Sequence, residues 1–359
     1  MNTNRLLLIF TAIVICISAL QAQTGTLKTV PVNMRENLPV KLSEITGEIK
    51  KISLELTDES LIGIINRIIF KDDQLIIFEG KTDKVMLFDL QGKYIRQIGS
   101  KGQGPDEYSQ IIDIAYDDIE RIVFIVSTSR KILCYNIEGL LIKECPIGFP
   151  EAIFFNDGYI NLISTRFGEK VEKGYLNRTT LYRIDNRCNL QDSLIVKSVL
   201  LERLGGSTFP QKDFISQVNS QTFFYYPILT PEPIVRDTLY ELKDGKLSPF
   251  LKLRFSDERS AASRNNKTKN LTNIWRSERF VFAHYQNRDG DFNFMHDLKT
   301  GQSANMKDGF VDDVHHTGTV KIRPLGDNLF YYLITPEFSD LEEEPNPDVY
   351  IGTFISTVQ

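Results

Sequence analysis

Histidine is scarce in this chain, and the catalytic patterns built on it are missing. The 359 residues include four histidines, which are His284, His296, His315 and His316. Histidine is the commonest general base in enzymes, and the G-x-S-x-G elbow that would expose a serine nucleophile does not occur. Carboxylates are plentiful, with 47 Asp and Glu, so a pair of them discriminates nothing. The sequence therefore names no catalytic residue.

Cysteine is equally scarce, with four residues, of which Cys16 lies in an N-terminal apolar run. The odd number that remains, Cys134, Cys145 and Cys188, argues against a disulfide framework. If the hairpin between the first two turns over two residues, Cys134 faces Lys143 and Cys145 faces Ile132. The two cysteines are then diagonal neighbours about 7 Å apart, too far to bridge. We expect no structural disulfide.

A strong charge of either sign is also absent. The formal net charge is −5, and acidic and basic residues are interspersed. Such a surface has no electrostatic footprint for a nucleic acid or an anionic membrane. We therefore expect neither as a partner.

The N-terminus has the features of an export signal. A singly basic start ends at Arg5, and a nearly unbroken apolar run follows over residues 6–20. The run of about 15 residues is shorter than the roughly 20 that span a bilayer. Cys16 follows Ile15, where a lipoprotein signal requires a small residue, which disfavours lipid anchoring. We predict a signal peptide over 1–22, cleaved after Ala22, and an exported protein without a membrane span, located in the periplasm, at the cell surface or outside the cell.

A short repeat runs through the rest of the chain. An aromatic residue, a polar residue, a short gap and a glycine connect two strand-like runs in F-D-L-Q-G-K-Y-I (88–95) and Y-N-I-E-G-L-L-I (135–142). Weaker copies occur at 182–187, 240–247 and 295–302. A period of roughly 40 to 50 residues, with each unit ending in a hairpin, is typical of a propeller.

The best-defined unit, 64–99, contains four strand-like runs joined by turn residues. Its apolar runs are continuous, as expected when both faces of a sheet are buried. Further units follow at 111–147, 151–196, 220–255 and 275–306, and charged or Gly- and Ser-rich stretches at 166–177, 201–214 and 256–273 are expected to be loops. The last unit, with strands at 321–324, 328–335 and 349–354, lacks one strand, which 49–56 would supply. We therefore predict an all-β fold: a six-bladed β-propeller of four-stranded antiparallel blades, closed by an N-terminal strand. Five or seven blades would result if one irregular stretch is misassigned.

The segment G-S-K-G-Q-G-P-D-E-Y (99–108) has the glycine content of a phosphate loop. A phosphate loop ends in G-K-[ST] and opens a helix, whereas this segment leads into a strand. We therefore interpret it as a tight crossover. In this interpretation its glycines allow positive φ, Glu107 binds backbone amides and Tyr108 packs between sheets.

The densest group of candidate metal ligands is Asp312, Asp313, His315 and His316. Adjacent residues of a strand point to opposite faces, so one Asp and one His at most could share a centre. Other blades would have to add ligands such as Asp113 or Glu151. A solvated loop is the simpler interpretation.

Two further features have competing interpretations. The aromatic runs 223–226 and 330–332 could stack sugar rings at a propeller mouth, although burial between blades is the commoner role. The acidic stretch 340–348 could bind a cation or a basic peptide, with a solvated loop as the default.

Several segments resemble the six-bladed β-propeller proteins exported by Bacteroidetes. They are L-S-E-I (42–45), I-S-L-E-L-T (52–57), L-I-G (61–63), I-G-S-K-G-Q-G-P-D-E-Y (98–108) and D-T-L-Y-E-L (237–242). The chain is more distantly similar to NHL-repeat propellers. The resemblance implies fold and compartment, because most members have no assigned activity. The chain departs from the pattern at F-V-D-D-V-H-H-T-G (310–318), so that a family-wide role for His315 and His316 is not implied.

These observations lead to two functional hypotheses for a single domain over 23–359. The first is a non-catalytic binding or scaffold propeller of the cell envelope, whose partner is an envelope protein, a peptide or a glycan. The alternative is a metal-dependent hydrolase or lyase acting on a lactone, a sugar or a peptide-derived substrate, with Ca²⁺ at the axis. No other cofactor is expected.

Overall fold

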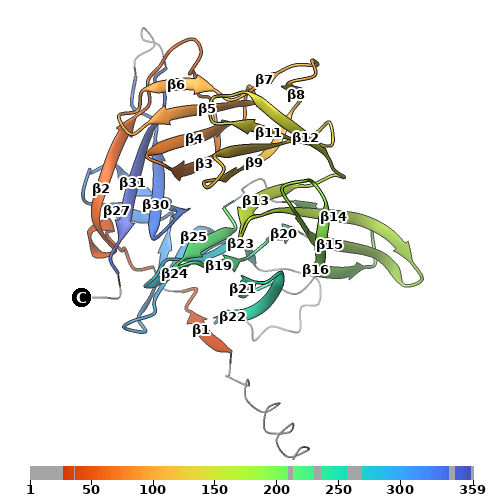
Figure 1. The fold of residues 1–359 in the computed structure, drawn as a ribbon. Helices are drawn as coiled ribbons and strands as arrows, with labels where there is room; N and C mark the ends of the chain where they lie inside the picture. Colours follow the sequence, from red (N-terminus) through yellow and green to blue (C-terminus); the bar gives the residue numbers. More distant parts are fainter. Residues whose placement is uncertain are drawn as a thin grey trace, which may run out of the picture.

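The structure is a computed structural model that describes residues 27–35, 37–208, 213–229, 236–256, 269–338 and 344–356. The predicted signal peptide, 1–22, lies outside the described residues. Within them the regular secondary structure consists almost entirely of β-strands (Figure 1). The only regular exception in the described part is the one-turn 3-10 helix η1 (Leu42–Glu44).

Six sheets of four or five strands follow one another along the described chain. Within each sheet, consecutive strands pair antiparallel, as in a propeller blade. Four sheets take all their strands from one continuous stretch: β3–β6 (Ile65–Lys71, Gln74–Glu79, Lys84–Asp89, Tyr94–Gln97), β9–β12 (Ile111–Asp117, Ile122–Ser127, Lys131–Asn136, Leu141–Pro146), β13–β16 (Ala152–Asn156, Tyr159–Val171, Gly174–Ile184, Leu190–Leu201) and β23–β26 (Lys269–Arg276, Phe280–Asn287, Gly290–Asp297, Ser303–Lys307).

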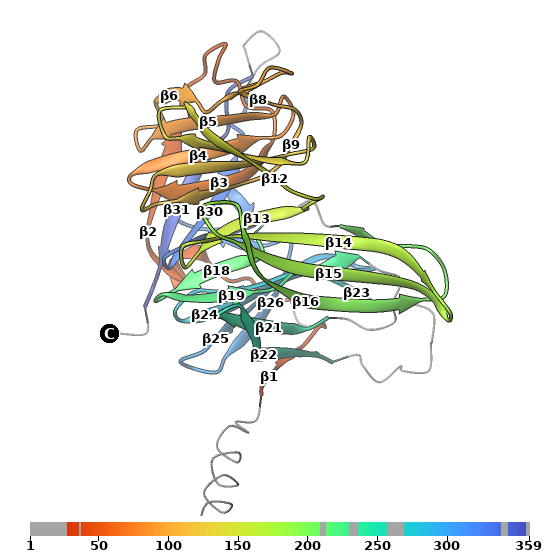
Figure 2. The ribbon, with the colours of Figure 1, turned by 45° about the vertical axis from the view of Figure 1, so that its right-hand side comes forward.

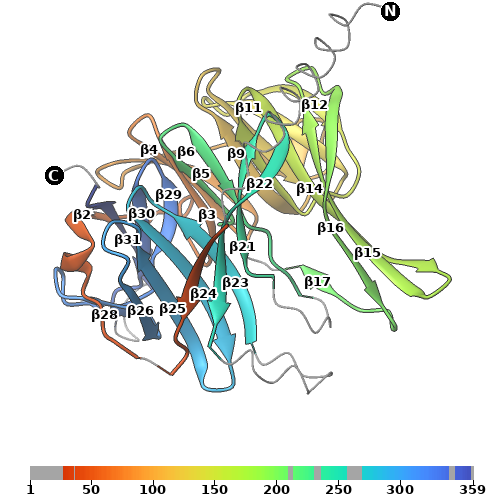
Figure 3. The same ribbon diagram turned by 90° about the horizontal axis from the view of Figure 1, so that it is seen from below.

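The other two sheets each include an N-terminal strand. They are β18, β19, β21 and β22 (Ile215–Val218, Gln221–Phe224, Thr238–Lys243, Lys246–Phe255) with β1 (Lys28–Val32), and β29–β31 (Arg323–Gly326, Leu329–Ile334, Asp348–Phe354) with β2 (Thr46–Ser53). β1 pairs parallel with β22, whereas β2 pairs antiparallel with β31, so that Ile52 faces Val349. Figure 3 shows β2 beside the C-terminal strands. The predicted pairing of an N-terminal strand with the last unit is therefore present, three residues earlier than expected.

Both faces of the first sheet are buried, which accounts for its continuous apolar runs. Along β4, Leu75 and Ile77 pack in one core cluster, with Tyr331 of the last sheet, and Ile76 and Phe78 pack in another, with residues of the second sheet. The two clusters alternate along the strand because successive side chains point to opposite faces. The sheet is thus held between two neighbours, as the sequence predicted.

The polar residue of the repeat motif stabilises the turn between the last two strands of a sheet. Asp89 Oδ1 accepts hydrogen bonds from the backbone N–H groups of Gln91 and Lys93, both at 2.9 Å. Gly92 closes the same turn with φ +80°. Asn136 and Gly139 repeat the arrangement, with Leu140 N donating to Asn136 Oδ1 at 2.8 Å. The motif therefore marks a side-chain-stabilised turn.

The segment 99–108 is a crossover between sheets, as predicted. β7 (Ser100–Lys101) pairs with β8 (Glu107–Tyr108), Gly104 N donates to Glu107 Oε2 at 2.7 Å, and Tyr108 is buried. The role predicted for the glycines holds for Gly99 alone, whose φ is +63°. At Gly102 the constraint is close approach, because an added Cβ would overlap the Glu107 carboxylate.

Two predicted loops differ from the structure. The charged stretch 166–177 is wrong as a loop, because its residues continue the long hairpin β14–β15, which projects beyond the other strands (Figure 2). The stretches 201–214 and 256–273 lie partly outside the described residues. β17 (Ser207–Thr208), β20 (Ile228–Leu229), β27 (Phe310–Asp312) and β28 (Gly318–Val320) form two small additional sheets.

The aromatic runs belong to the core. All seven residues of 223–226 and 330–332 are buried, which supports core packing over a sugar platform. Part of the acidic stretch 340–348 lies outside the described residues, but Asn346 is buried and ties this stretch to the N-terminal region. Its Oδ1 accepts from Ile62 N and its Nδ2 donates to Glu55 O, both at 2.8 Å. This end of the stretch is therefore packed rather than solvated.

The expectation of no structural disulfide is wrong. Cys145 of β12 is bonded to Cys188, and their Cα atoms are 5.6 Å apart. Cys188 occupies the turn position that Gly92 and Gly139 fill in the repeat, with φ +69°. The geometric argument about Cys134 was nevertheless correct, since Cys134 faces Lys143, Cys145 faces Ile132, and Cys134 is a buried free thiol.

We predict that replacing Cys145 and Cys188 together by alanine lowers the free energy of unfolding by about 3 kcal/mol, because the bond restricts the unfolded chain over a separation of 43 residues. Urea denaturation measures the change. Cys134→Ala is the control and should cost less, about 1 kcal/mol. Burial raises the pKa of the Cys134 thiol to about 11, so alkylation should modify it only after unfolding. Labelling of all three thiols without a reductant would contradict the bond.

Candidate functional site

The first strands of neighbouring sheets meet around a buried ion pair. Arg67 of β3 donates through Nη1 to both carboxylate oxygens of Asp113 on β9, at 2.8 Å, and to the carbonyl oxygen of Ile153 on β13, at 2.9 Å. Asp113, which is fully buried, also accepts from the backbone N–H groups of Ile114 and Ile153. One guanidinium thus joins three sheets.

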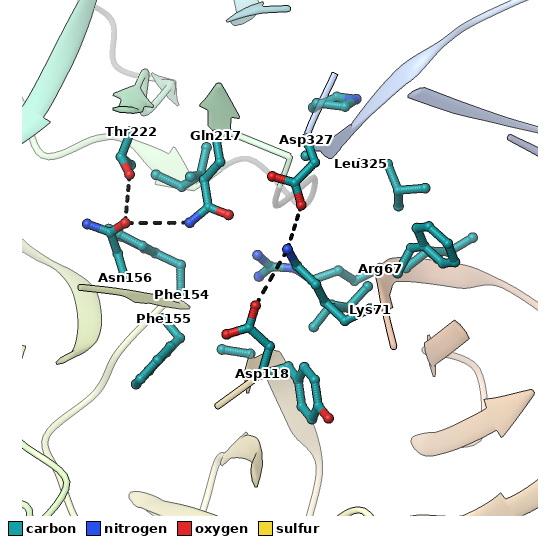
Figure 4. A pocket seen from close by; sticks show the side chains of 18 of the residues that line it. Arg67, Lys71, Asp118, Phe154, Phe155, Asn156, Gln217, Thr222, Leu325 and Asp327 are labelled. Atoms are coloured by element: carbon teal, nitrogen blue, oxygen red, sulfur yellow. Dashed lines mark hydrogen bonds and ion pairs between the residues drawn. The ribbon is translucent and has the colours of Figure 1, made fainter. Parts of the chain in front are cut away.

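A pocket of about 480 Å³ lies beside this ion pair (Figure 4). Its walls come from the first strands of several sheets, which include Lys71 at the end of β3, and from the turns that follow such strands, at Asp118, Asp157, Ser220 and Asp327. Five sheets of the described chain contribute residues to the pocket, namely those that contain β3, β9, β13, β18 and β29. The pocket is therefore a product of the assembled sheets.

Charged residues face one another across one side of the pocket. Lys71 Nζ lies 2.6 Å from Asp327 Oδ2 and 3.6 Å from Asp118 Oδ2, and Figure 4 shows the lysine between the two carboxylates. Burial disfavours the charged ammonium, but the hydrogen bond to Asp327 and the two negative charges outweigh it, so the pKa of Lys71 is raised. The lysine charge is held in place and neutralised.

Amide and hydroxyl groups form the opposite side. Asn156 Oδ1 accepts from Thr222 Oγ1 at 2.6 Å and from Gln217 Nε2 at 3.5 Å. Asn156 Nδ2 donates to Asp157 Oδ2 at 2.9 Å. The rings of Phe154 and Phe155 lie on the same side in Figure 4. This wall can exchange hydrogen bonds with a polar ligand and pack against its apolar parts.

Asp213 is the most buried acidic group of the lining. Its side chain is 10% exposed, and its Oδ2 lies 3.8 Å from Arg323 Nε. Burial raises the pKa of this carboxyl group, with the nearby Asp113 acting in the same direction and Arg323 and Arg67 opposing. The Asp213 carboxylate accepts no hydrogen bond from the described residues at this distance.

The metal candidates lie elsewhere, at the end of β27 and in the turn between β27 and β28, and their side chains contact different partners. Asp312 accepts from Val314 N, His315 N, Thr317 Oγ1 and Tyr332 Oη, and Asp313 accepts from Ser43. Although burial alone would raise the pKa of Asp312, these hydrogen bonds lower it. His315 packs against Tyr350, and His316 adopts φ +58°.

The two other residues that we considered as ligands are also engaged. Asp113 is paired with Arg67, and Glu151 accepts from Thr165 and from Tyr226 Oη, both at 3.0 Å. In the part of the chain that the structure describes, no three His, Cys, Asp or Glu side chains are grouped so as to hold a metal ion.

Sequence reasoning missed Arg67, Asn156, Asp213 and Gln217. A usable signal existed in one case, because Arg67, next to Asn66, places a charge inside the strand-like run I-N-R-I-I-F. Asp213 had no such signal, since it precedes its strand. The roles of Arg67 and Asp213 at the pocket depend on contacts with residues of other sheets.

Comparison with known proteins identifies the family of this chain. The chain matches the family described as "Domain of unknown function (DUF4934)" over residues 27–351, and it belongs to that family. None of the curated proteins matches it. No helix among the described residues has the length and apolar character needed to cross a membrane.

Two solved structures share the fold at low identity, and a third is similar with a lower score. A Bacteroides fragilis protein named as a candidate exported protein has a TM-score of 0.67 and 16% identity, covering 92% of this chain and 100% of that one. A member of the DUF4221 family from Bacteroides vulgatus has a TM-score of 0.51 and 11% identity, covering 86% and 97%. The Cps50 (Swd1) β-propeller domain of Myceliophteria thermophila has a TM-score of 0.42 and 10% identity, covering 85% and 99%.

We predict that Arg67→Met lowers the free energy of unfolding by about 3–5 kcal/mol, because it leaves the buried Asp113 carboxylate without its counter-ion. Urea denaturation measures this. The control Lys71→Met should cost about 1 kcal/mol or less, since its partner Asp327 is 64% exposed. Equal losses in the two variants would contradict the central role of the buried pair. Adding Asp113→Leu to Arg67→Met should recover much of the loss.

Acid should destabilise the protein through His284. Burial, together with Arg323 and Lys321, lowers the pKa of His284 from 6.5 to about 4 against the opposing charge of Asp291. The unfolded chain therefore binds more protons between these values, and stability falls as the pH drops through this window, by up to about 1.4 kcal/mol per pH unit. His284→Gln should flatten the slope of unfolding free energy against pH. The exposed His316→Asn serves as control, and an unchanged slope in His284→Gln would contradict the assignment.

Proposed function

We propose that the protein is a single-domain six-bladed β-propeller, residues 23–359, exported after removal of its signal peptide. Six core clusters support the blade count, because each of them lies between two sheets. One of these clusters contains Leu75 of the first sheet together with Tyr331 and Val349 of the last. The pairing of β2 with β31 supports closure of the ring between chain ends, which leaves no open sheet face.

We further propose that this propeller is a non-catalytic binding module of the cell envelope, and that its ligand occupies the axial pocket. The observation that carries the proposal is the pocket of about 480 Å³, whose polar lining comes from several sheets. Small-molecule sites are typically concave, preformed and lined by a few converging polar groups. A short glycan or a peptide end fits a site of this size and polarity.

The chemistry of the lining favours binding over catalysis. Lys71 is held between two carboxylates, and Arg67 is held by Asp113 and by Ile153. The histidines, the usual general bases, do not line the pocket. A metal-dependent hydrolase or lyase would need a cation site, and no observation of the described residues favours one.

The test is a binding screen of the purified protein against short glycans and peptides by isothermal titration calorimetry. The expected result is saturable binding that Asn156→Ala weakens about three- to tenfold, because it removes one or two hydrogen-bonding groups from the wall. The matched control is Asn287→Ala, which alters the last residue of β24, outside the pocket.

Two results would contradict the proposal. Turnover of a bound compound that Asp213→Asn abolishes would make the protein an enzyme. Ligand binding that Asn156→Ala leaves unchanged would place the site elsewhere on the molecule.

A further inference from the structure

The basic groups that line the pocket already have partners. Arg67 donates to Asp113 and to the Ile153 carbonyl oxygen, and Lys71 lies against Asp327 and Asp118. The lining as a whole includes two basic residues, Arg67 and Lys71, and four acidic residues, Asp118, Asp157, Asp213 and Asp327. The cations are thus neutralised within the protein, and the charge that remains for a ligand is negative.

Asp213 is the acidic group that most lacks partners. Carboxylate oxygens can accept about four hydrogen bonds, yet the Asp213 side chain, 10% exposed, has only the long contact of 3.8 Å to Arg323 among the described residues. A buried carboxylate without donors is unfavourable. It is therefore a position at which a guest that supplies donors gains binding energy.

Two neighbours of Asp213 also have unused polar atoms. Asn273 Nδ2 donates to the Asp213 backbone carbonyl at 2.5 Å, whereas Asn273 Oδ1 is buried without a hydrogen-bond partner. Tyr331 Oη is likewise buried without one, and its pKa is raised by burial and by Asp213 against the opposing effect of the nearby Arg323. Asp213 and Asn273 thus offer acceptors, and the Tyr331 hydroxyl can accept as well as donate.

We propose that Asp213, the most buried acidic residue of the pocket lining, binds a primary ammonium group of the ligand as its counter-ion, and that Asn273 and Tyr331 beside it supply further acceptors. The inference rests on the proposed binding function and names the chemistry of its ligand.

An ammonium group fits these atoms better than the other donors available. It presents three N–H donors and one positive charge, whereas a hydroxyl presents a single donor and no charge. A charge-assisted hydrogen bond is also stronger than a neutral one. A divalent cation is disfavoured, since it would need further carboxylate ligands, and among the described residues no three His, Cys, Asp or Glu side chains are grouped so as to hold one. Amino sugars and the amino end of a peptide both carry the group.

The experiment compares matched ligands that differ only in the amino group. Glucosamine is tested against N-acetylglucosamine, and triglycine against N-acetyltriglycine, by calorimetry with the full protein at pH 7. Acetylation removes the charge and two donors, so the free amine of at least one pair should bind at least about tenfold more tightly. The pair that shows the difference distinguishes a saccharide source from a peptide source.

Variants then locate the effect. Asp213→Asn should abolish the preference for the free amine, and Asp289→Asn, which changes an exposed turn residue outside the pocket, should leave it intact. A thermal melt of each variant checks folding. If Asp213→Asn does not fold, the comparison of free and acetylated ligands with the unchanged protein still tests whether an ammonium group is preferred.

Three outcomes would overturn the inference. They are equal affinity for free and acetylated ligands, failure of every amine to bind, and displacement of a bound amine by Ca²⁺ at equimolar concentration. If free and acetylated ligands bind equally well and Asn156→Ala weakens the binding of both, the proposed binding function is retained and only the ammonium site is excluded. Binding that is independent of both Asp213 and Asn156 would remove the proposed function as well.

Discussion

The hydrogen-bonded ion pair between Arg67 and Asp113 constrains the centre of the molecule. Burial of two charges is unfavourable unless their geometry and hydrogen bonds are good, and here a single guanidinium nitrogen donates to Asp113 and to the main chain of Ile153. The strands that carry these residues, β3, β9 and β13, can therefore approach only in one relative position. The turns that follow these strands then surround the pocket. The position of the pocket is thus a consequence of the packing of the sheets and of the turns that follow their first strands.

Much of the fold was predictable, because local signals and burial agree. Runs such as Leu75–Phe78 are apolar at every position, which identifies a strand covered on both faces, and the Asp and Gly residues of the repeat mark the turns between strands. The long hairpin β14–β15 was not predictable in this way. Its residues are charged and partly exposed, and they are held as strands by main-chain pairing with each other and with β16. The Cys145–Cys188 bond was missed because its partners are 43 residues apart and belong to different sheets.

The site was less predictable than the fold, for a related reason. Asp312, Asp313, His315 and His316 attracted interest because they are dense along the chain. In a propeller-like array, however, groups gather across sheets, so that neighbours in space are separated by whole repeats. Asp113 and Arg67 are 46 residues apart, and Asp213 and Arg323 are much further apart. The four residues that are dense along the chain instead belong to a turn whose backbone N–H groups donate hydrogen bonds to Asp312. A better signal would have been a charged residue inside an apolar first strand.

The buried polar groups at and beside Asp213 link stability to binding. Native proteins leave few buried polar groups without partners, and those that remain destabilise the folded state until donors or acceptors reach them. Asp213, Asn273 and Tyr331 combine such groups within one small region. Their unfavourable burial is tolerable because the surrounding core clusters and the Arg67–Asp113 pair hold the sheets together independently. A guest that satisfies these atoms therefore does not need to reorganise the fold. Its binding energy comes from groups that the folded protein already holds in place, which is the physical basis for selectivity in a preformed site.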